Sequence, residues 1–376
     1  MRGNVRRIST SYKFRNVLGT GSFTVEPPKA VGIASSRGQR LYQEDALSAK
    51  VLNLPMTPSM KDNQCAYFGI FDGHGGPFVS QYLRDHLANL IERISKRDWS
   101  LLDYFRPSLA DVAEMTTGNY FPYDKGHSGE LTIKERLMLA FLKADKAAIT
   151  DAQNRAYMCG STASVLLLQS LDDPPASYAF SGRLQMSTAH CGDTAILLVK
   201  AHSGTVERLT DDDHADNIGE AARLKHFRGA LVQDSYGESR LLGQIANTRS
   251  IGDAKYKSWG VTAEPHTRSS EIDGRNYSLA ILVSDGILNT ISIQEIADVA
   301  RSKFAQQLVR GRAAQAAAQA VVDFAIDVGA DDNCSALTVP LPGFMTAGKG
   351  RDKTRDLRDY RLQLANDPDS VRQRRQ

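Results

Sequence analysis

The chain has 376 residues, of which 41% are hydrophobic, and a formal net charge of +3. A chain of this length and composition can bury a large core, and no apolar run approaches the roughly 18 residues that a membrane-spanning helix requires. We therefore expect a soluble, monomeric protein without integral membrane association.

The charge is distributed unevenly along the chain. Residues 1–25 carry five basic groups and no acidic group, and residues 349–376 carry nine basic and five acidic groups. The part between them has a net charge of −6. An acidic centre argues against a nucleic-acid surface spread over the folded domain, and it suits a site in which carboxylates surround cations.

The N-terminal segment has the composition of a targeting sequence. Residues 1–25 are rich in Arg and Ser, lack acids and contain spaced apolar residues, as mitochondrial presequences do. We therefore expect a mitochondrial matrix location. A basic segment without a targeting role, in a cytoplasmic or nuclear protein, is the alternative.

Strands and helices then follow in groups. Strands are predicted at 30–34, 46–51 and 65–71, and a helical period begins after Pro77 and continues to about Ile94. Residues 95–131 show little periodicity and are expected to form an irregular insertion, which a second helix follows at about 132–154. Further strands are predicted from their apolar runs at 162–168, 184–190, 195–199, 279–283 and 335–339.

A helical region is expected at 293–326, between the last two strands, with a break near Gly311. Because strands come in groups and helices in pairs, the pattern favours an α+β sandwich of antiparallel sheets covered by helices. The catalytic domain is expected at 26–342. Residues 343–376 form a basic tail, for which a solvated helix or an extension is expected.

The four cysteines lie far apart, each beside or inside an apolar run, and no CxxC pair occurs. We expect buried free thiols in a reducing compartment. A disulfide framework or a zinc site is the alternative.

Three aspartates share one sequence context: Asp72, Asp285 and Asp332 each adjoin a strongly apolar run and a glycine or asparagine. Carboxylates at the ends of buried strands are partly desolvated and repel one another, so they persist only beside cations or hydrogen-bond donors. Oxygen ligands without His or Cys indicate Mg²⁺ or Mn²⁺ rather than zinc. A turn or cap would explain any one of them, and the coincidence of three favours a metal site.

His74 lies between two glycines in the same loop as Asp72. Near neutral pH an imidazole can donate a proton to a leaving alkoxide. Gly73 and Gly75 allow the backbone to approach a ligand or metal closely. A purely structural histidine is the alternative interpretation.

Seven short motifs occur together in one order. They read RLYQED at 40–45, FDGHGG at 71–76, GSTA at 160–163, CGDT at 191–194, TRSIGD at 248–253, SDG at 284–286 and DN at 332–333. In this order they resemble the metal-dependent protein phosphatase family, type 2C, including its mitochondrial fungal-type members. The resemblance extends from about Lys29 to Pro340, nearly the whole chain outside the two tails.

The resemblance implies a four-layer α/β/β/α sandwich whose paired sheets hold two Mg²⁺ or Mn²⁺ ions at one end. By motif, Asp72 would bridge the ions and the carbonyl of Gly73 would bind one of them. Asp285 and Asp332 would complete the ligand set. The remaining acids of the first motif, Glu44 and Asp45, would orient metal-bound waters.

The same resemblance implies a protein-serine/threonine phosphatase, a phosphoric monoester hydrolase acting on phosphorylated proteins. Arg40 would bind the phosphate, since a planar guanidinium suits bidentate contacts with an oxyanion. A water acidified by both metals would attack phosphorus while His74 protonates the leaving oxygen, so no phosphoenzyme is needed. Arg249 and Asp253 match motif positions too, and a structural role is expected for them.

Two departures from the family pattern leave alternatives open. Asp193 matches a position linked to a third, weaker cation, but Asn289 stands where family members usually carry aspartate, so that site is expected to be weaker or absent. The segment 213–216 is also altered, reading DHAD. A catalytically weak pseudophosphatase that binds a phosphorylated partner is one alternative, and a metal-dependent hydrolase of small phosphate esters is another.

Overall fold

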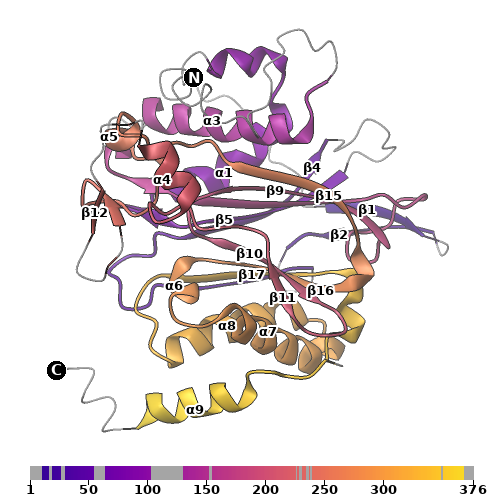
Figure 1. The fold of residues 1–376 in the computed structure, drawn as a ribbon. Helices are drawn as coiled ribbons and strands as arrows, with labels where there is room; N and C mark the ends of the chain where they lie inside the picture. Colours follow the sequence, from indigo (N-terminus) through magenta and orange to yellow (C-terminus); the bar gives the residue numbers. More distant parts are fainter. Residues whose placement is uncertain are drawn as a thin grey trace.

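Two five-stranded antiparallel sheets lie face to face at the centre of the computed structural model, and helices cover the outer face of each (Figure 1). The structure describes residues 11–16, 19–26, 30–54, 64–102, 130–151, 155–225, 227, 231–233, 237, 239–348 and 350–367. Helix, sheet, sheet and helix form four layers, which confirms the predicted α+β sandwich.

The first sheet has the strand order β15-β9-β8-β5-β4. Its strands are β4 (Ala46–Asn53), β5 (Gln64–Phe71), β8 (Ala163–Ser170), β9 (Arg183–Cys191) and β15 (His266–Asp273). Helices α1 (Phe78–Arg93) and α3 (Ile133–Asp151) cover it, and α1 buries Leu83, Leu87 and Ile91 at helical spacing. Every residue of β8 is buried, since layers cover both faces of this strand.

The second sheet has the strand order β11-β10-β16-β17-β3. Its strands are β3 (Gly32–Ser36), β10 (Ala195–Lys200), β11 (Val206–Arg208), β16 (Tyr277–Val283) and β17 (Cys334–Pro340). Helices α7 (Ile293–Gln307) and α8 (Ala313–Asp327) cover it, and Gly311 between them is left-handed at φ 65°, which confirms the predicted break. Helix α8 lies close to β3 because Gly32 has no side chain, and a Cβ there would lie 2.0 Å from the Ala314 carbonyl oxygen.

Shorter elements connect the strands and helices of these layers. Short strands β6 (Gly73–His74), β7 (Gly160–Ser161) and β14 (Ile251–Gly252) form a three-stranded sheet. The others are β12 (Leu231–Gln233), β13 (Ser239–Leu241), α4 (Ile218–Leu224), α5 (Ala254–Lys257), α6 (Asp285–Leu288) and the 3₁₀ helices η1 (Lys96–Ser100), η2 (Arg155–Tyr157), η3 (Gly274–Asn276), η4 (Leu308–Arg310) and η5 (Pro342–Thr346).

Part of the expected irregular insertion is ordered as η1. Residues 103–129 of that insertion lie outside the described residues.

None of the described helices combines the length and hydropathy needed to span a bilayer. All four cysteines are free and buried, as predicted.

An N-terminal hairpin occupies part of the expected presequence. Strands β1 (Ser11–Asn16) and β2 (Gly19–Thr24) pair with each other, and the Lys13 backbone amide donates to the side chain of Gln64 at 2.8 Å. Tyr12 is fully buried, with its ring 5.8 Å from that of Tyr178. Tyr12 and Val25 therefore contribute to the core between the sheets, whereas residues 1–10 lie outside the described residues.

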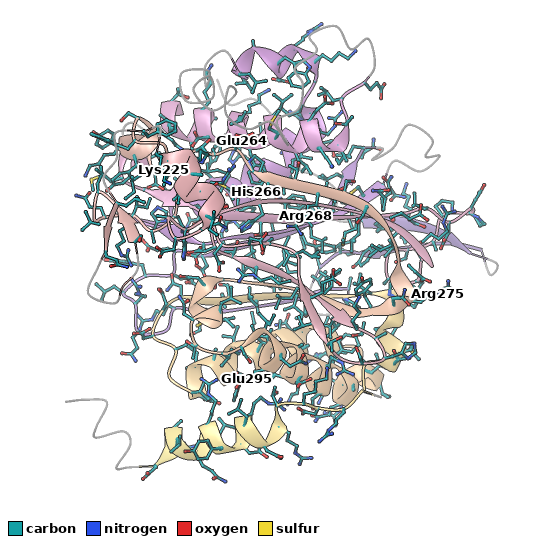
Figure 2. The ribbon with its side chains drawn as sticks, in the orientation of Figure 1. Lys225, Glu264, His266, Arg268, Arg275 and Glu295 are labelled. Atoms are coloured by element: carbon teal, nitrogen blue, oxygen red, sulfur yellow. The ribbon has the colours of Figure 1, made fainter. Side chains whose placement is uncertain are left out.

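The C-terminal tail contains a docked helix, α9 (Arg355–Asn366). The Asp298 carboxylate on α7 accepts hydrogen bonds from the backbone amides of Lys353 and Thr354, at 2.9 and 3.1 Å. Figure 2 shows Glu295 on α7, and Arg361 of α9 binds this carboxylate at 2.9 Å. Polar contacts therefore hold α9, although it buries no residue completely.

We expect the hairpin to contribute to stability. Substituting Tyr12→Ala removes a fully buried ring and should lower the free energy of unfolding by about 3 kcal/mol. The exposed neighbour Lys13→Ala should change it by less than about 0.5 kcal/mol. Urea unfolding of the full chain measures both values, and equal effects would contradict a packed hairpin.

Candidate active site

Acidic side chains converge where several strands of the two sheets end. Asp72 follows β5, Asp193 follows β9 and Asp285 follows β16. Each of the three offers a carboxylate oxygen within 4.8 Å of the others. Antiparallel pairing in the second sheet explains the closeness of Asp193 and Asp285. Val283 pairs with Ala195 and with Ala336, so the end of β16 lies beside the starts of β10 and β17.

A cavity of about 680 Å³ opens over these carboxylates. It is lined by residues from both sheets and from the segments that connect them. Among them are the expected site residues Arg40, Glu44, Asp72, Gly73, His74, Asp193, Asp285 and Asp332. The structure therefore brings these residues to one cleft, with Asp193 rather than Asp332 in the closest group of three acids.

Burial and mutual repulsion raise the pKa of three carboxyls at this site, those of Asp72, Asp285 and Asp45. Burial raises the pKa of Asp72 well above its usual range, and the charges of Asp45 and Asp285 raise it further. Burial also raises the pKa of Asp285 to about 7, with Asp193 contributing, and that of Asp45 to about 6. A cation between them would relieve this repulsion, and clustered hard oxygen donors fit Mg²⁺ or Mn²⁺.

Gly73 lines the cleft and packs closely against neighbouring backbone. A Cβ on Gly73 would lie 2.5 Å from the carbonyl oxygen of Glu44, so only glycine fits. Asn333 holds the same Glu44 segment, because its side-chain amide oxygen accepts a hydrogen bond from the Glu44 backbone amide at 2.7 Å. The segments that contain Glu44, Gly73 and Asp332 are therefore fixed relative to one another.

Arg40 points into the cleft. Its Nη2 contacts Oδ2 of Asp332 at 2.6 Å, and its side chain is 62% exposed. A guanidinium has five N–H donors, so this contact leaves donors available to an oxyanion.

His74 is held by Asp253. The Nε2 atom of His74 lies 2.8 Å from Oδ2 of Asp253, a residue in the left-handed region at φ 50°. A Cβ on Gly160 would lie 2.1 Å from Asp253 Oδ2 and 2.6 Å from His74 Nε2, so the contact requires glycine there. Burial disfavours the imidazolium, but the charge of Asp253 and its hydrogen bond outweigh this and raise the pKa of His74.

The sequence did not indicate that Asp253 touches His74. A structural role was expected for Asp253, and the contact arises because β6 and β14 both pair with β7.

Arg249 does have the expected structural position. It is buried, and its guanidinium binds Glu220 of α4 at 2.8 Å and the Glu264 carbonyl oxygen at 2.7 Å.

Asp193 and Asn289, the residues considered for a third cation, both line the cleft. Oδ2 of Asp193 lies 3.0 Å from Nε2 of His214. Burial alone would raise the pKa of Asp193, but the hydrogen bond and the charge of His214 outweigh burial and lower that pKa. The amide nitrogen of Asn289 donates to Oδ2 of Asp285 at 3.2 Å. In the altered 213–216 segment, Ala215 is buried and Asp213 accepts from the Gly192 amide at 2.8 Å.

The family model described as Protein phosphatase 2C matches residues 30–334 of the chain. The chain belongs to this family. It is thus a metal-dependent protein-serine/threonine phosphatase. Phosphatase 2C sequences resemble it over most of its length. Protein phosphatase 2C homolog 4 of Schizosaccharomyces pombe (strain 972) is 28% identical over 357 residues, which cover 93% of this chain and 87% of that protein.

A second relative and a solved structure agree with this assignment. Protein phosphatase 1K, mitochondrial, of Xenopus laevis is 27% identical over 315 residues, covering 83% of this phosphatase 2C chain and 68% of its own length. The crystal structure of serine-threonine phosphatase 2C from Toxoplasma gondii superposes with a TM-score of 0.60 at 19% identity, covering 89% of this chain and 100% of that one. At 19% identity, this structural similarity is evidence for the fold alone.

The raised pKa of Asp285 predicts how stability depends on pH and metal. The carboxyl of Asp285 binds its proton more tightly in the folded chain than in the unfolded chain. As the pH rises from 3.8 through about 7, loss of this proton therefore lowers the stability of the folded state. In EDTA at pH 8, Asp285→Asn should therefore raise the melting temperature by on the order of 2–5 °C.

Added Mn²⁺ should raise the melting temperature of the unmodified chain much more than that of Asp285→Asn. Calorimetry with and without Mn²⁺ measures both effects. Asp323→Asn, at an exposed position on α8, is the control and should respond to Mn²⁺ as the unmodified chain does. An equal response of Asp285→Asn would argue against a metal site at this carboxylate.

Proposed function

We propose that this phosphatase 2C chain hydrolyses phosphoserine and phosphothreonine in proteins by direct attack of water, at a centre that binds two Mg²⁺ or Mn²⁺ ions. The observation that carries the proposal is the group of Asp72, Asp193 and Asp285, whose oxygens lie within 4.8 Å of one another in a cleft shared with Arg40 and His74. Raised pKa values at Asp72 and Asp285 indicate that this group needs a compensating cation.

The proposed ligands are Asp72, the Gly73 carbonyl, Asp285 and Asp332. Cations held by these residues would lower the pKa of a bound water and would neutralise charge on the phosphoryl group. Glu44 lines the cleft, and Asp45 is buried with no well-formed hydrogen bond to either oxygen among the described residues. This supports a role for both in orienting waters.

Two further side chains act on the substrate in this proposal. Arg40 binds phosphoryl oxygens with the donors that Asp332 leaves available, and so fixes the orientation of the phosphorus atom. His74, whose pKa the contact with Asp253 raises, donates a proton to the leaving serine or threonine oxygen. Asp253 positions the ring and stabilises its charged form.

A third cation at Asp193 would bind weakly. Asp193 belongs to the close group of acids, but His214 already donates to its carboxylate and Asn289 supplies an amide rather than a charge. No feature of the described site favours a pseudophosphatase.

The compartment is a separate proposal. The basic N-terminus and the likeness to a phosphatase named as mitochondrial support a matrix location. Because Tyr12 and Val25 are buried, removal of all 25 residues would expose the core that they cover. We expect a reporter fused to residues 1–25 to enter mitochondria, and a diffuse cytosolic signal would count against this location.

The direct test is phosphate release from a phosphothreonine peptide by the full chain. We expect release with Mn²⁺ or Mg²⁺, none in EDTA, and a loss on the order of 100-fold in Asp285→Asn. Asp323→Asn should retain the activity. Turnover that persists in EDTA would contradict metal dependence, and folded, metal-loaded protein without turnover would favour the pseudophosphatase.

The His74 pair predicts a pH effect. The rate falls as pH rises through the pKa of a general acid, and Asp253 raises the pKa of His74, so it extends activity toward alkaline pH. Asp253→Asn should move the alkaline limb of the kcat profile to lower pH and reduce kcat at pH 8 by about tenfold. An unchanged alkaline limb would exclude His74 as the acid that Asp253 tunes.

A further inference from the structure

Two pairs of large, exposed apolar side chains belong to segments that adjoin residues lining the cleft. Leu41 and Tyr42 are 80% and 71% exposed, and they directly follow Arg40, which lines the cleft. Tyr157 and Met158 are 52% and 55% exposed. The second pair adjoins the loop that contains His74, because a Cβ on Gly75 would lie 2.3 Å from the Met158 carbonyl oxygen.

The backbone beneath the first pair is fixed by hydrogen bonds. The side-chain amide of Asn333 donates to the carbonyl oxygens of Arg37 and Tyr42, both at 3.0 Å. The guanidinium of Arg37 donates to the carbonyl oxygens of Arg40 and Leu41, both at 3.3 Å. The segment that contains Asp332 and Asn333 thus holds this loop in place while the two side chains remain in solvent.

The backbone beneath the second pair is also packed against the cleft. Gly75 is left-handed at φ 68°, which allows its close approach to Met158. The thiol of Cys159 donates to the Gly76 carbonyl oxygen at 3.0 Å. Both pairs are therefore presented by ordered backbone, so a ligand that covers them loses little entropy in ordering the protein.

A single exposed apolar residue needs no explanation, but grouped ones mark interaction surfaces. Here one pair is adjacent to the proposed phosphate-binding residue and the other to the proposed general acid. Leu41 and Tyr42 lie one and two residues from Arg40, roughly 4–8 Å along the backbone. The Met158 carbonyl packs in space against Gly75, the residue that follows His74. An extended substrate advances about 3.3 Å per residue, so side chains within about three positions of the phosphorylated residue can reach both pairs.

We propose that Leu41, Tyr42, Tyr157 and Met158 form an apolar rim that binds aliphatic or aromatic side chains flanking the phosphorylated residue of a protein substrate. The inference rests on the proposed function, because it places the phosphoryl group in the cleft. The cleft itself is lined mainly by charged and polar residues, so the phosphate binds inside and apolar flanks bind at the rim. The preferred substrates are phosphorylated sites in apolar sequence surroundings.

The test compares two phosphothreonine peptides with the full chain and Mn²⁺. One has Leu or Phe within three positions on both sides of the phosphothreonine, and the other has Ser at the same positions. We expect kcat/KM to be about tenfold higher for the apolar peptide, mainly through KM. In the double variants Leu41→Ser/Tyr42→Ser and Tyr157→Ser/Met158→Ser this ratio should fall toward one.

The control is Val309→Ser, a fully exposed residue of η4 on the helical layer, which should keep the tenfold ratio. Equal kcat/KM for the two peptides in the unmodified chain would overturn the rim, as would a ratio unchanged in both double variants. Hydrolysis of p-nitrophenyl phosphate, a small phosphate ester, distinguishes failure of the proposed function from failure of the apolar rim alone. If neither peptide nor this small ester is hydrolysed, the proposed function fails, whereas hydrolysis without peptide preference removes the rim alone.

Discussion

The repulsion among buried carboxylates is the constraint on which the rest of the site depends. Asp72, Asp193 and Asp285 approach within 4.8 Å, and burial together with their like charges opposes ionisation of Asp72 and Asp285. Such a cluster lowers the stability of the folded chain unless a cation is present. The sandwich tolerates it because large hydrophobic clusters, under each helical layer and between the sheets, stabilise the strands that hold these acids.

Glycines and one asparagine give the cleft its rigidity. Gly73 and Gly160 stand where any Cβ would collide with the Glu44 carbonyl or with the His74–Asp253 pair. Asn333 joins the segments around Arg37, Tyr42 and Glu44 with three hydrogen bonds. The groups proposed to bind phosphate, donate the proton and present the apolar rim are therefore held in one arrangement before any substrate binds.

The C-terminal helix is connected to the same cleft. Arg361 of α9 binds Glu295 and also donates to the Thr290 carbonyl oxygen at 2.7 Å. Residues on either side of Thr290, including Asn289 and Ile291, line the cavity. A tail that looks only basic and polar in the sequence thus supports one wall of the site through an ion pair, which apolar periodicity does not reveal.

The sequence determined the layered α+β fold, most strands of the two central sheets, the four helices that cover them, and eight of the residues that line the cleft, because apolar periodicity and short motifs are local properties of the chain. It did not indicate β15, whose residues are mostly polar at a sheet edge, or the β1–β2 hairpin, whose Tyr12 is buried only by distant partners such as Tyr178. The contact of Asp253 with His74 and the closeness of Asp193 to Asp72 also depend on strand pairing between distant segments. Only the tertiary structure decides such contacts, since they follow from which strand ends lie side by side.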